Sequence, residues 1–161
     1  MITLTKMNAN PLSTLAALLI LVSCQSPSSS ESETRPTGVT VLTPSALAAA
    51  RSRPVQFTAH VKPILAAKCV MCHNNGAQPG KMDLSSKAAA LRTGAIGLWI
   101  VPGKPDQSLL LTKTANAPAH LKAMPPVGEQ ITPDELSVLR KWVAEGADWP
   151  SGSAGLVSPP K

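Results

Sequence analysis

The chain contains the stretch Cys69-Val70-Met71-Cys72-His73, which has the form Cys-x-x-Cys-His. Two thiols at this spacing lie on one helical turn, where both can reach the two vinyl groups on one edge of a porphyrin. The imidazole that follows them then falls at the iron as an axial ligand. This pattern is the attachment signature of a c-type haem. The sequence therefore predicts one covalent haem c held by Cys69 and Cys72, with His73 on the metal.

The composition is that of one small domain with few aromatic side chains. The chain has 161 residues, with one Phe, three Trp and no Tyr. A domain of about 100 residues with so few large rings has to fill its interior with aliphatic side chains or with a cofactor. The formal net charge is +6, but between residues 55 and 150 ten Lys/Arg face seven Asp/Glu and the lysines are scattered. Nucleic-acid-binding proteins gather positive charge on one face, so we expect no nucleic-acid partner.

The first 23 residues have the features of a bacterial export signal. Lys6 supplies positive charge ahead of the apolar run 15–22, which is too short to cross a bilayer. Leu21-Val-Ser-Cys24 then resembles a lipobox, in which the cysteine is acylated and becomes the first residue of the mature protein. The alternative is an ordinary secretory signal followed by an unrelated cysteine. We predict a lipoprotein signal peptide at 1–23 and lipidation of Cys24, which would anchor the exported protein to a bacterial membrane, facing the periplasm or the cell exterior.

The number of cysteines agrees with this prediction. Three cysteines in an exported chain would leave one thiol over if Cys69 and Cys72 formed a disulfide. If Cys24 carries lipid and the other two carry haem, no thiol is left over. Export also matches the chemistry, because c-type haem is attached outside the cytoplasm.

Shifts in composition predict the domain boundaries. Residues 24–54 are rich in Ser and Pro, which indicates a flexible, lipidated linker with at most one short helical turn at 44–51. We expect the folded domain at 55–150 and a loose tail at 151–161.

Apolar spacing predicts helices throughout the domain. Helical periodicity covers 57–68, where Pro63 begins or bends the helix, and shorter helices are expected at 85–91 and 108–113. No alternating pattern of a useful length indicates a strand. The predicted fold class is therefore all-α.

The last helix carries the clearest local signal. Thr132 and Glu135 have capping-box spacing, and Pro133 occupies the first helical position. Ile131 before the cap is placed to pack as a hydrophobic staple, and Gly146 is a natural stop.

A haem iron with His73 on one side takes a second ligand on the other, usually Met or His. Met124 is followed by two prolines, which restrict the backbone around a flexible thioether. It lies 51 residues after His73, far enough for the chain to wrap round a porphyrin. We predict Met124 as the distal ligand, with His120 as the main rival. Other candidates are expected elsewhere: His60 in solvent or near a propionate, Met71 in packing, and Met82 in the core.

Further segments occur in a recognisable order around the haem motif. They are Gly80-Lys-Met-Asp-Leu-Ser85, Ile100-Val-Pro-Gly-Lys-Pro-Asp-Gln-Ser-Leu-Leu110, Met124-Pro-Pro126 and Trp142-Val-Ala-Glu-Gly-Ala147. Together they resemble the Planctomycete-type cytochrome c domain. The resemblance implies a small cytochrome c-like helical domain wrapped around one haem, with His73 as proximal and Met124 as distal ligand. Asn74 departs from the family's usual Gly, and Met82 from its more usual Leu.

Saturated His/Met ligation leaves no open site on the iron, so we expect an electron carrier that serves redox partner proteins, not an enzyme. One alternative is a haem enzyme or ligand sensor in which Met124 dissociates. Another is a thiol–disulfide enzyme using Cys69 and Cys72, although such sites usually lie at a helix start in a βαβ unit. A zinc site is weaker still, because Cys69, Cys72 and His73 supply at most three crowded ligands.

Overall fold

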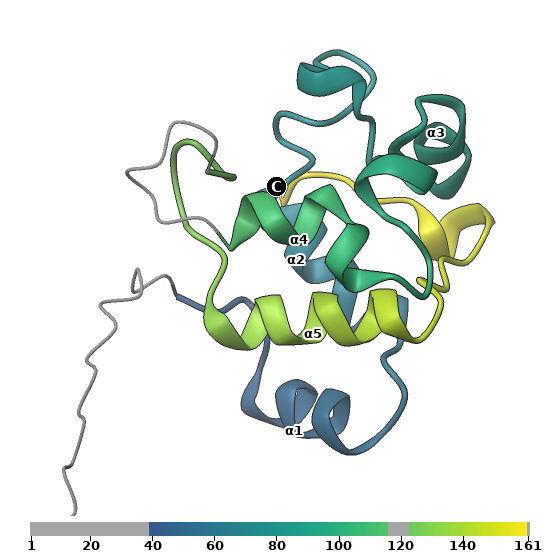
Figure 1. The fold of residues 1–161 in the computed structure, drawn as a ribbon. Coiled ribbons are helices and arrows are strands. Elements are labelled where there is room, and N and C mark those ends of the chain that lie inside the picture. Colours follow the sequence, from purple (N-terminus) through teal and green to yellow (C-terminus); the bar gives the residue numbers. More distant parts are fainter. Residues whose placement is uncertain (1–38, 116–122, 161) are drawn as a thin grey trace, which may run out of the picture. The chain divides into compact units, whose positions relative to one another are not determined.

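The structure is a computed structural model that describes residues 39–115 and 123–160 (Figure 1). Within these ranges every regular element is a helix or helical turn, which confirms the all-α class. In chain order the elements are α1 (Pro44–Ser52), η1 (Phe57–Val61), α2 (Lys62–Lys68), η2 (Pro79–Lys81), α3 (Lys87–Arg92), η3 (Ala95–Trp99), η4 (Pro105–Gln107), α4 (Leu109–Thr114), α5 (Pro133–Ala144) and η5 (Gly152–Gly155). None of the helices in the described ranges is long and apolar enough to cross a membrane.

The longest helix, α5, begins as the sequence predicts. The Thr132 hydroxyl accepts a hydrogen bond from the Glu135 N–H at 3.2 Å, and the Glu135 carboxylate accepts one from the Thr132 N–H at 2.8 Å. This reciprocal capping box satisfies two backbone donors that a helix start otherwise leaves unpaired. Apart from Glu135, the residues that α5 buries are apolar: Val138, Leu139, Trp142 and Val143.

Helix α5 lies between α1 and α4 and contacts both (Figure 1). Its Lys141 ammonium donates to the carbonyls of Ala50 and Arg53 at 2.7 Å each, where α1 ends. These carbonyls have no partner inside α1, so the lysine acts as its C-terminal cap. Helix α1 is therefore attached to the domain by specific contacts.

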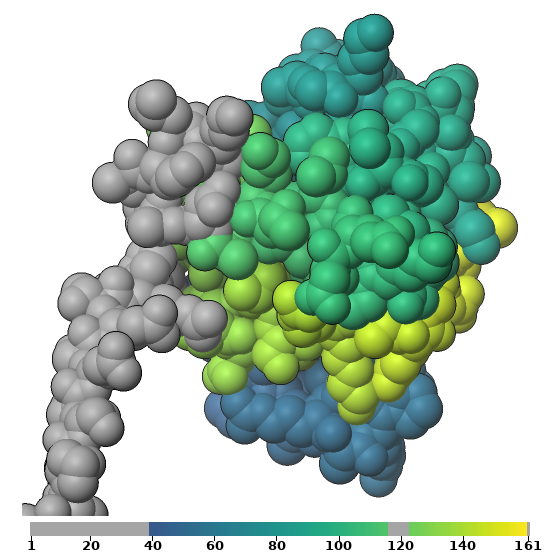
Figure 2. All heavy atoms as spheres, viewed as in Figure 1, coloured from purple at the N-terminus to yellow at the C-terminus, as the bar shows by residue number. Residues whose placement is uncertain are grey.

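The folded region starts earlier than the expected boundary at residue 55. Leu42, Leu47 and Ala50 are buried in the common core, although they lie in the segment expected to be a flexible linker. In Figure 2 the atoms of α1, in blue, cover the lower part of the face shown. The Ser/Pro-rich composition conceals this helix, because only a few small apolar residues carry its packing.

The folded region also continues past residue 150. Val157 is buried and its N–H donates to the Ser85 carbonyl at 2.9 Å, while the indole N–H of Trp149 donates to the Gly155 carbonyl at 2.8 Å. The segment expected to be a loose tail thus closes over the core as far as residue 157.

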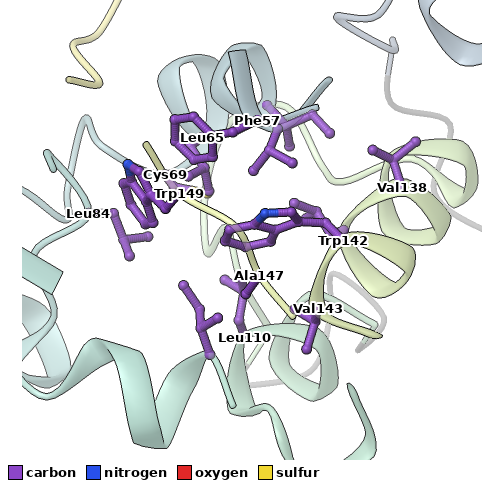
Figure 3. Close-up of a cluster of buried hydrophobic side chains, with 14 of the residues drawn as sticks. Phe57, Leu65, Cys69, Leu84, Leu110, Val138, Trp142, Val143, Ala147 and Trp149 are labelled. Carbon is purple, nitrogen blue, oxygen red and sulfur yellow. The ribbon is translucent and has the colours of Figure 1, made fainter. Parts of the chain in front are cut away.

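The core is organised around three of the four aromatic side chains. Phe57 stacks on Trp149 with ring centroids 4.7 Å apart, and Trp142 lies 6.0 Å from Phe57 and 6.1 Å from Trp149. Such offset and edge-on pairs add to the energy of apolar burial. Figure 3 shows Trp142 near the centre of this cluster, to which Cys69 also belongs. The haem motif therefore lies against a packed core.

The entry helix has two parts. A π-helical turn, η1, runs directly into α2, and Pro63 lies in the first turn of α2, as expected. His60 within η1 is buried, and its Nδ1 atom accepts a hydrogen bond from the Gln56 N–H at 2.9 Å. The expectation of a solvated or propionate-facing His60 is therefore wrong, since the ring serves the backbone of its own turn.

The pKa of His60 is lowered from its ordinary 6.5 by burial and then by the positive charge of Lys141. The unfolded chain therefore takes up a proton on this ring at a higher pH than the folded chain does. It follows that the stability contributed by neutral His60 is complete above about pH 6.5 and is lost as the pH falls below that value.

In His60→Asn the side-chain oxygen can still accept the Gln56 N–H. We expect the free energy of unfolding of this variant to fall less than that of wild type between about pH 7.5 and about pH 5. Urea unfolding of the full chain at the two pH values measures this difference. An equal loss in both proteins would show that His60 does not contribute to the acid sensitivity.

Candidate functional site

One cavity of about 250 Å³ contains all the described residues predicted to bind the haem. Cys69, Cys72 and His73 lie on one side of it, and Met124 reaches it from a distant part of the chain. The remaining lining residues are mostly apolar: Ala67, Lys68, Met71, Met82, Trp99, Leu110, Lys113, Thr114, Pro125, Pro126, Val127, Gly128 and Glu129. Cys24 and His120, the other two predicted candidates, lie outside the described residues.

The haem motif is a tight turn that follows the end of α2. Cys69 is the C-terminal cap of the helix, and its carbonyl accepts hydrogen bonds from the N–H groups of Cys72 at 3.2 Å and His73 at 3.0 Å. The His73 carbonyl in turn accepts the Leu84 N–H at 2.9 Å. The backbone thus fixes the two thiols and the imidazole relative to one another.

Asn74 stabilises the loop that leaves the motif. Its side-chain amide donates to the carbonyls of Val70 and Met71 at 2.7 and 3.1 Å, and its oxygen accepts the Gly76 N–H at 2.8 Å. Asparagine is well suited to such local turns, because its side chain can replace a backbone partner. The departure from the usual Gly therefore adds hydrogen bonds that a glycine cannot make.

His73 has the properties of a neutral metal ligand. The ring is buried, and burial lowers its pKa, while the nearby backbone of Met82 and Pro79 acts in the opposite direction. Within the described part of the chain, its Nδ1 atom is buried without a hydrogen-bond partner of acceptable geometry. A neutral imidazole is the form that binds metals, and its second nitrogen normally donates to a neighbouring carbonyl.

The two cysteines do not resemble a redox-active pair. Among the described residues both are free thiols, with Cys69 buried and Cys72 exposed. Burial raises the pKa of Cys69 to about 12, and the negative charge of Glu135 acts in the same direction. Reactive cysteines have lowered pKa values and often lie at a helix start, whereas Cys69 lies at a helix end.

The loop that carries Met124 is attached at both ends. The Met124 N–H donates to the Lys113 carbonyl at 3.1 Å, at the end of α4. Further along, the side-chain amide of Gln130 donates to the carbonyls of Pro125 and Gly128 at 3.2 and 3.3 Å. The half-buried Met124 is therefore held by contacts on either side of it.

The other methionines take different positions. Met82 is buried, as expected, but it also lines the cavity and so brings another thioether to the site. Met71 was expected in packing, yet it is 64 % exposed at the cavity wall. The turn of the motif directs the residue between the two cysteines outward, which helical spacing alone does not reveal.

Trp99 is a lining residue that no sequence motif reveals. Its indole lies against Gly80, where an added Cβ atom would come within 2.9 Å of the ring. Gly80 also has a φ of +68°, a conformation that favours glycine. The glycine therefore allows Trp99 to close one wall of the cavity.

The donor set fits a covalently bound haem. Two thiols, one neutral imidazole and the thioether of Met124 share a cavity whose other walls are largely apolar. These are the groups that attach and ligate a c-type haem, and apolar walls suit a porphyrin face.

Comparison with known proteins agrees with this assignment. Residues 69–128 match the family model described as Planctomycete cytochrome C. No curated protein and no solved structure gives a significant match. The matched segment begins at Cys69 and includes Cys72, His73 and Met124. Cytochrome c domains bind haem, are typically exported and carry electrons in preference to acting as enzymes. The segment that begins with this haem motif, residues 69–128, is therefore similar to the Planctomycete cytochrome C family.

Proposed function

We propose that the protein is a mono-haem c-type cytochrome that carries electrons, with His73 and Met124 as its axial ligands. The observation that carries the proposal is the convergence of four donors on one cavity. Met124 lies 51 residues beyond His73, yet it lines the same cavity as His73, Cys69 and Cys72. This convergence supports a shared role for the four residues at one haem.

Each donor has a distinct task in this proposal. Cys69 and Cys72 would hold the haem by thioether bonds. His73 offers a neutral imidazole, since burial lowers its pKa. Met124 offers a thioether, a ligand that favours ferrous iron and raises the reduction potential relative to a second histidine. A haem bound there supplies one-electron redox chemistry.

Attachment of the distal loop favours a carrier over an enzyme. Hydrogen bonds to Lys113 and from Gln130 hold the loop on both sides of Met124. A firmly held Met124 would stay bound to the iron of a haem, and this would leave no coordination site for oxygen or a substrate. Cys72 and Met71 are exposed at the cavity wall, so a redox partner protein can approach the haem from that side.

Spectroscopy of the full-length protein tests the ligation. Reduced-minus-oxidised spectra should have c-type bands, and the ferric protein should have the near-infrared band of His/Met haem. Met124→Ala should lose the near-infrared band and gain carbon monoxide binding when reduced. Two matched controls should keep the band: Met82→Leu, at a buried thioether that also lines the cavity, and His120→Ala, at the rival ligand.

Three results would count against this assignment. Absence of c-type bands would show that the protein holds no covalent haem c. If His120→Ala or Met82→Leu loses the near-infrared band while Met124→Ala retains it, the distal ligand is the residue whose substitution removes the band. Carbon monoxide binding by the reduced wild-type protein would favour the haem enzyme or ligand sensor.

We further propose that Cys24 is lipidated and tethers the exported domain to a membrane. The lipobox Leu21-Val-Ser-Cys24 follows a positively charged start and an apolar run. Lipidation also accounts for the third cysteine, since Cys69 and Cys72 are used by haem. The tether would hold the carrier near redox proteins of the same membrane.

Fractionation of producing bacterial cells tests the tether. Wild-type protein should sediment with membranes and carry the added mass of acyl chains on Cys24. The variant Cys24→Ser should lack that mass and lose membrane association. Soluble wild-type protein without acyl mass would instead identify an ordinary secretory signal.

A further inference from the structure

Lys68 is a charged residue in an unusual position. Its side chain is 1 % exposed, it directly precedes Cys69, and it lines the cavity. The ammonium donates to the Val39 carbonyl at 3.0 Å, to the Gln130 carbonyl at 2.7 Å and to the Glu135 carboxylate at 2.8 Å. An ammonium has three hydrogens to donate, so all three have acceptors.

Its partner Glu135 is equally enclosed. The side chain is 0 % exposed, and one oxygen accepts the Val41 N–H at 2.9 Å. The other oxygen accepts the Thr132 N–H of the capping box together with Lys68. The pair therefore joins the end of α2, the start of α5 and the entering segment 39–41.

Two hydrogen bonds connect this pair to the distal loop. Lys68 donates to the carbonyl of Gln130, and the side-chain amide of Gln130 donates to the carbonyl of Pro125. Pro125 is the neighbour of Met124, just as Lys68 is the neighbour of Cys69. A hydrogen-bonded path from the haem motif to the neighbour of the proposed distal ligand thus runs through Lys68 and Gln130.

Stability alone does not account for such a pair. Removing two charges from water is costly, and an apolar replacement of a buried ion pair is often neutral or stabilising. What the pair supplies is geometry, because each of its hydrogen bonds fixes a different segment at the cavity.

We propose that Lys68 is a positioning residue that holds Met124 in place across the haem site, through Gln130. The inference rests on the proposed His73/Met124 ligation and goes beyond it. Weakening the path should raise the fraction of molecules in which Met124 has left the iron. An external ligand that binds only those molecules then gains apparent affinity in proportion to that fraction.

Imidazole titration of the ferric, full-length holoprotein measures that fraction. The main variant combines Lys68→Met with Glu135→Gln. The double change leaves no buried charge unpaired, and the capping box accepts Gln as well as Glu. We expect imidazole to bind at least about tenfold more tightly than to wild type, with a weaker near-infrared band.

Gln130→Ala is a milder second variant. It removes the side-chain bond to Pro125 and leaves the Lys68–Glu135 pair intact, so it decides the question even if the double variant does not fold. We expect about threefold tighter imidazole binding, a change within the usual range for a single coupled contact.

Lys141→Met is the matched control. This lysine also donates to backbone carbonyls, but those belong to the end of α1, and Lys141 does not line the cavity. The variant should lose stability and bind imidazole within about twofold of wild type.

The outcomes separate this inference from the function on which it rests. A wild-type protein without c-type or near-infrared bands would overturn both. A wild-type protein with both bands, and a wild-type imidazole affinity in the double variant or in Gln130→Ala, would overturn the positioning role alone. Equal tightening in Lys141→Met would also overturn it, because general destabilisation would then explain the effect.

Discussion

The buried ion pair between Lys68 and Glu135 is the contact that fixes how the segments around the cavity are placed. It joins residues 67 positions apart and gathers the entering segment, the helix before the haem motif and the start of α5. In a low-dielectric interior such a network is favourable only when every donor and acceptor is used. Each of its segments must therefore be in position for the others to be stable.

The two sides of the cavity are built on different principles. On the side of the haem motif, α2 and its terminal turn rest on a packed aromatic cluster, and Cys69 belongs to both core and cavity. On the other side, Met124 lies in an irregular loop that holds its shape through a few hydrogen bonds. Under the proposed ligation, a packed side that carries His73 and a hydrogen-bonded loop that carries Met124 would suit a redox centre that must change its charge with little rearrangement.

Sequence patterns predicted the features that depend on residues close together in the chain. The capping box at Thr132 and the proline at the start of α2 act within a few residues, so spacing alone reveals them. The Cys-x-x-Cys-His motif is equally local. Contacts that join distant segments left no such signal: Lys68 looks like an ordinary helical lysine, and α1 looks like part of a linker. Likewise, the burial of His60 and the exposure of Met71 follow from tertiary packing.

The entry of the chain into the domain sets how the cavity is presented to its surroundings. The Val39 N–H donates to Glu129, a residue of the cavity wall, at 3.0 Å. The fourteen residues 25–38 separate Val39 from Cys24 and can span no more than about 50 Å. An anchor at Cys24 would therefore attach to the domain beside a residue of the cavity wall. The cavity would then stay close to the membrane, and partners in the same membrane would meet it far more often than partners in bulk solution.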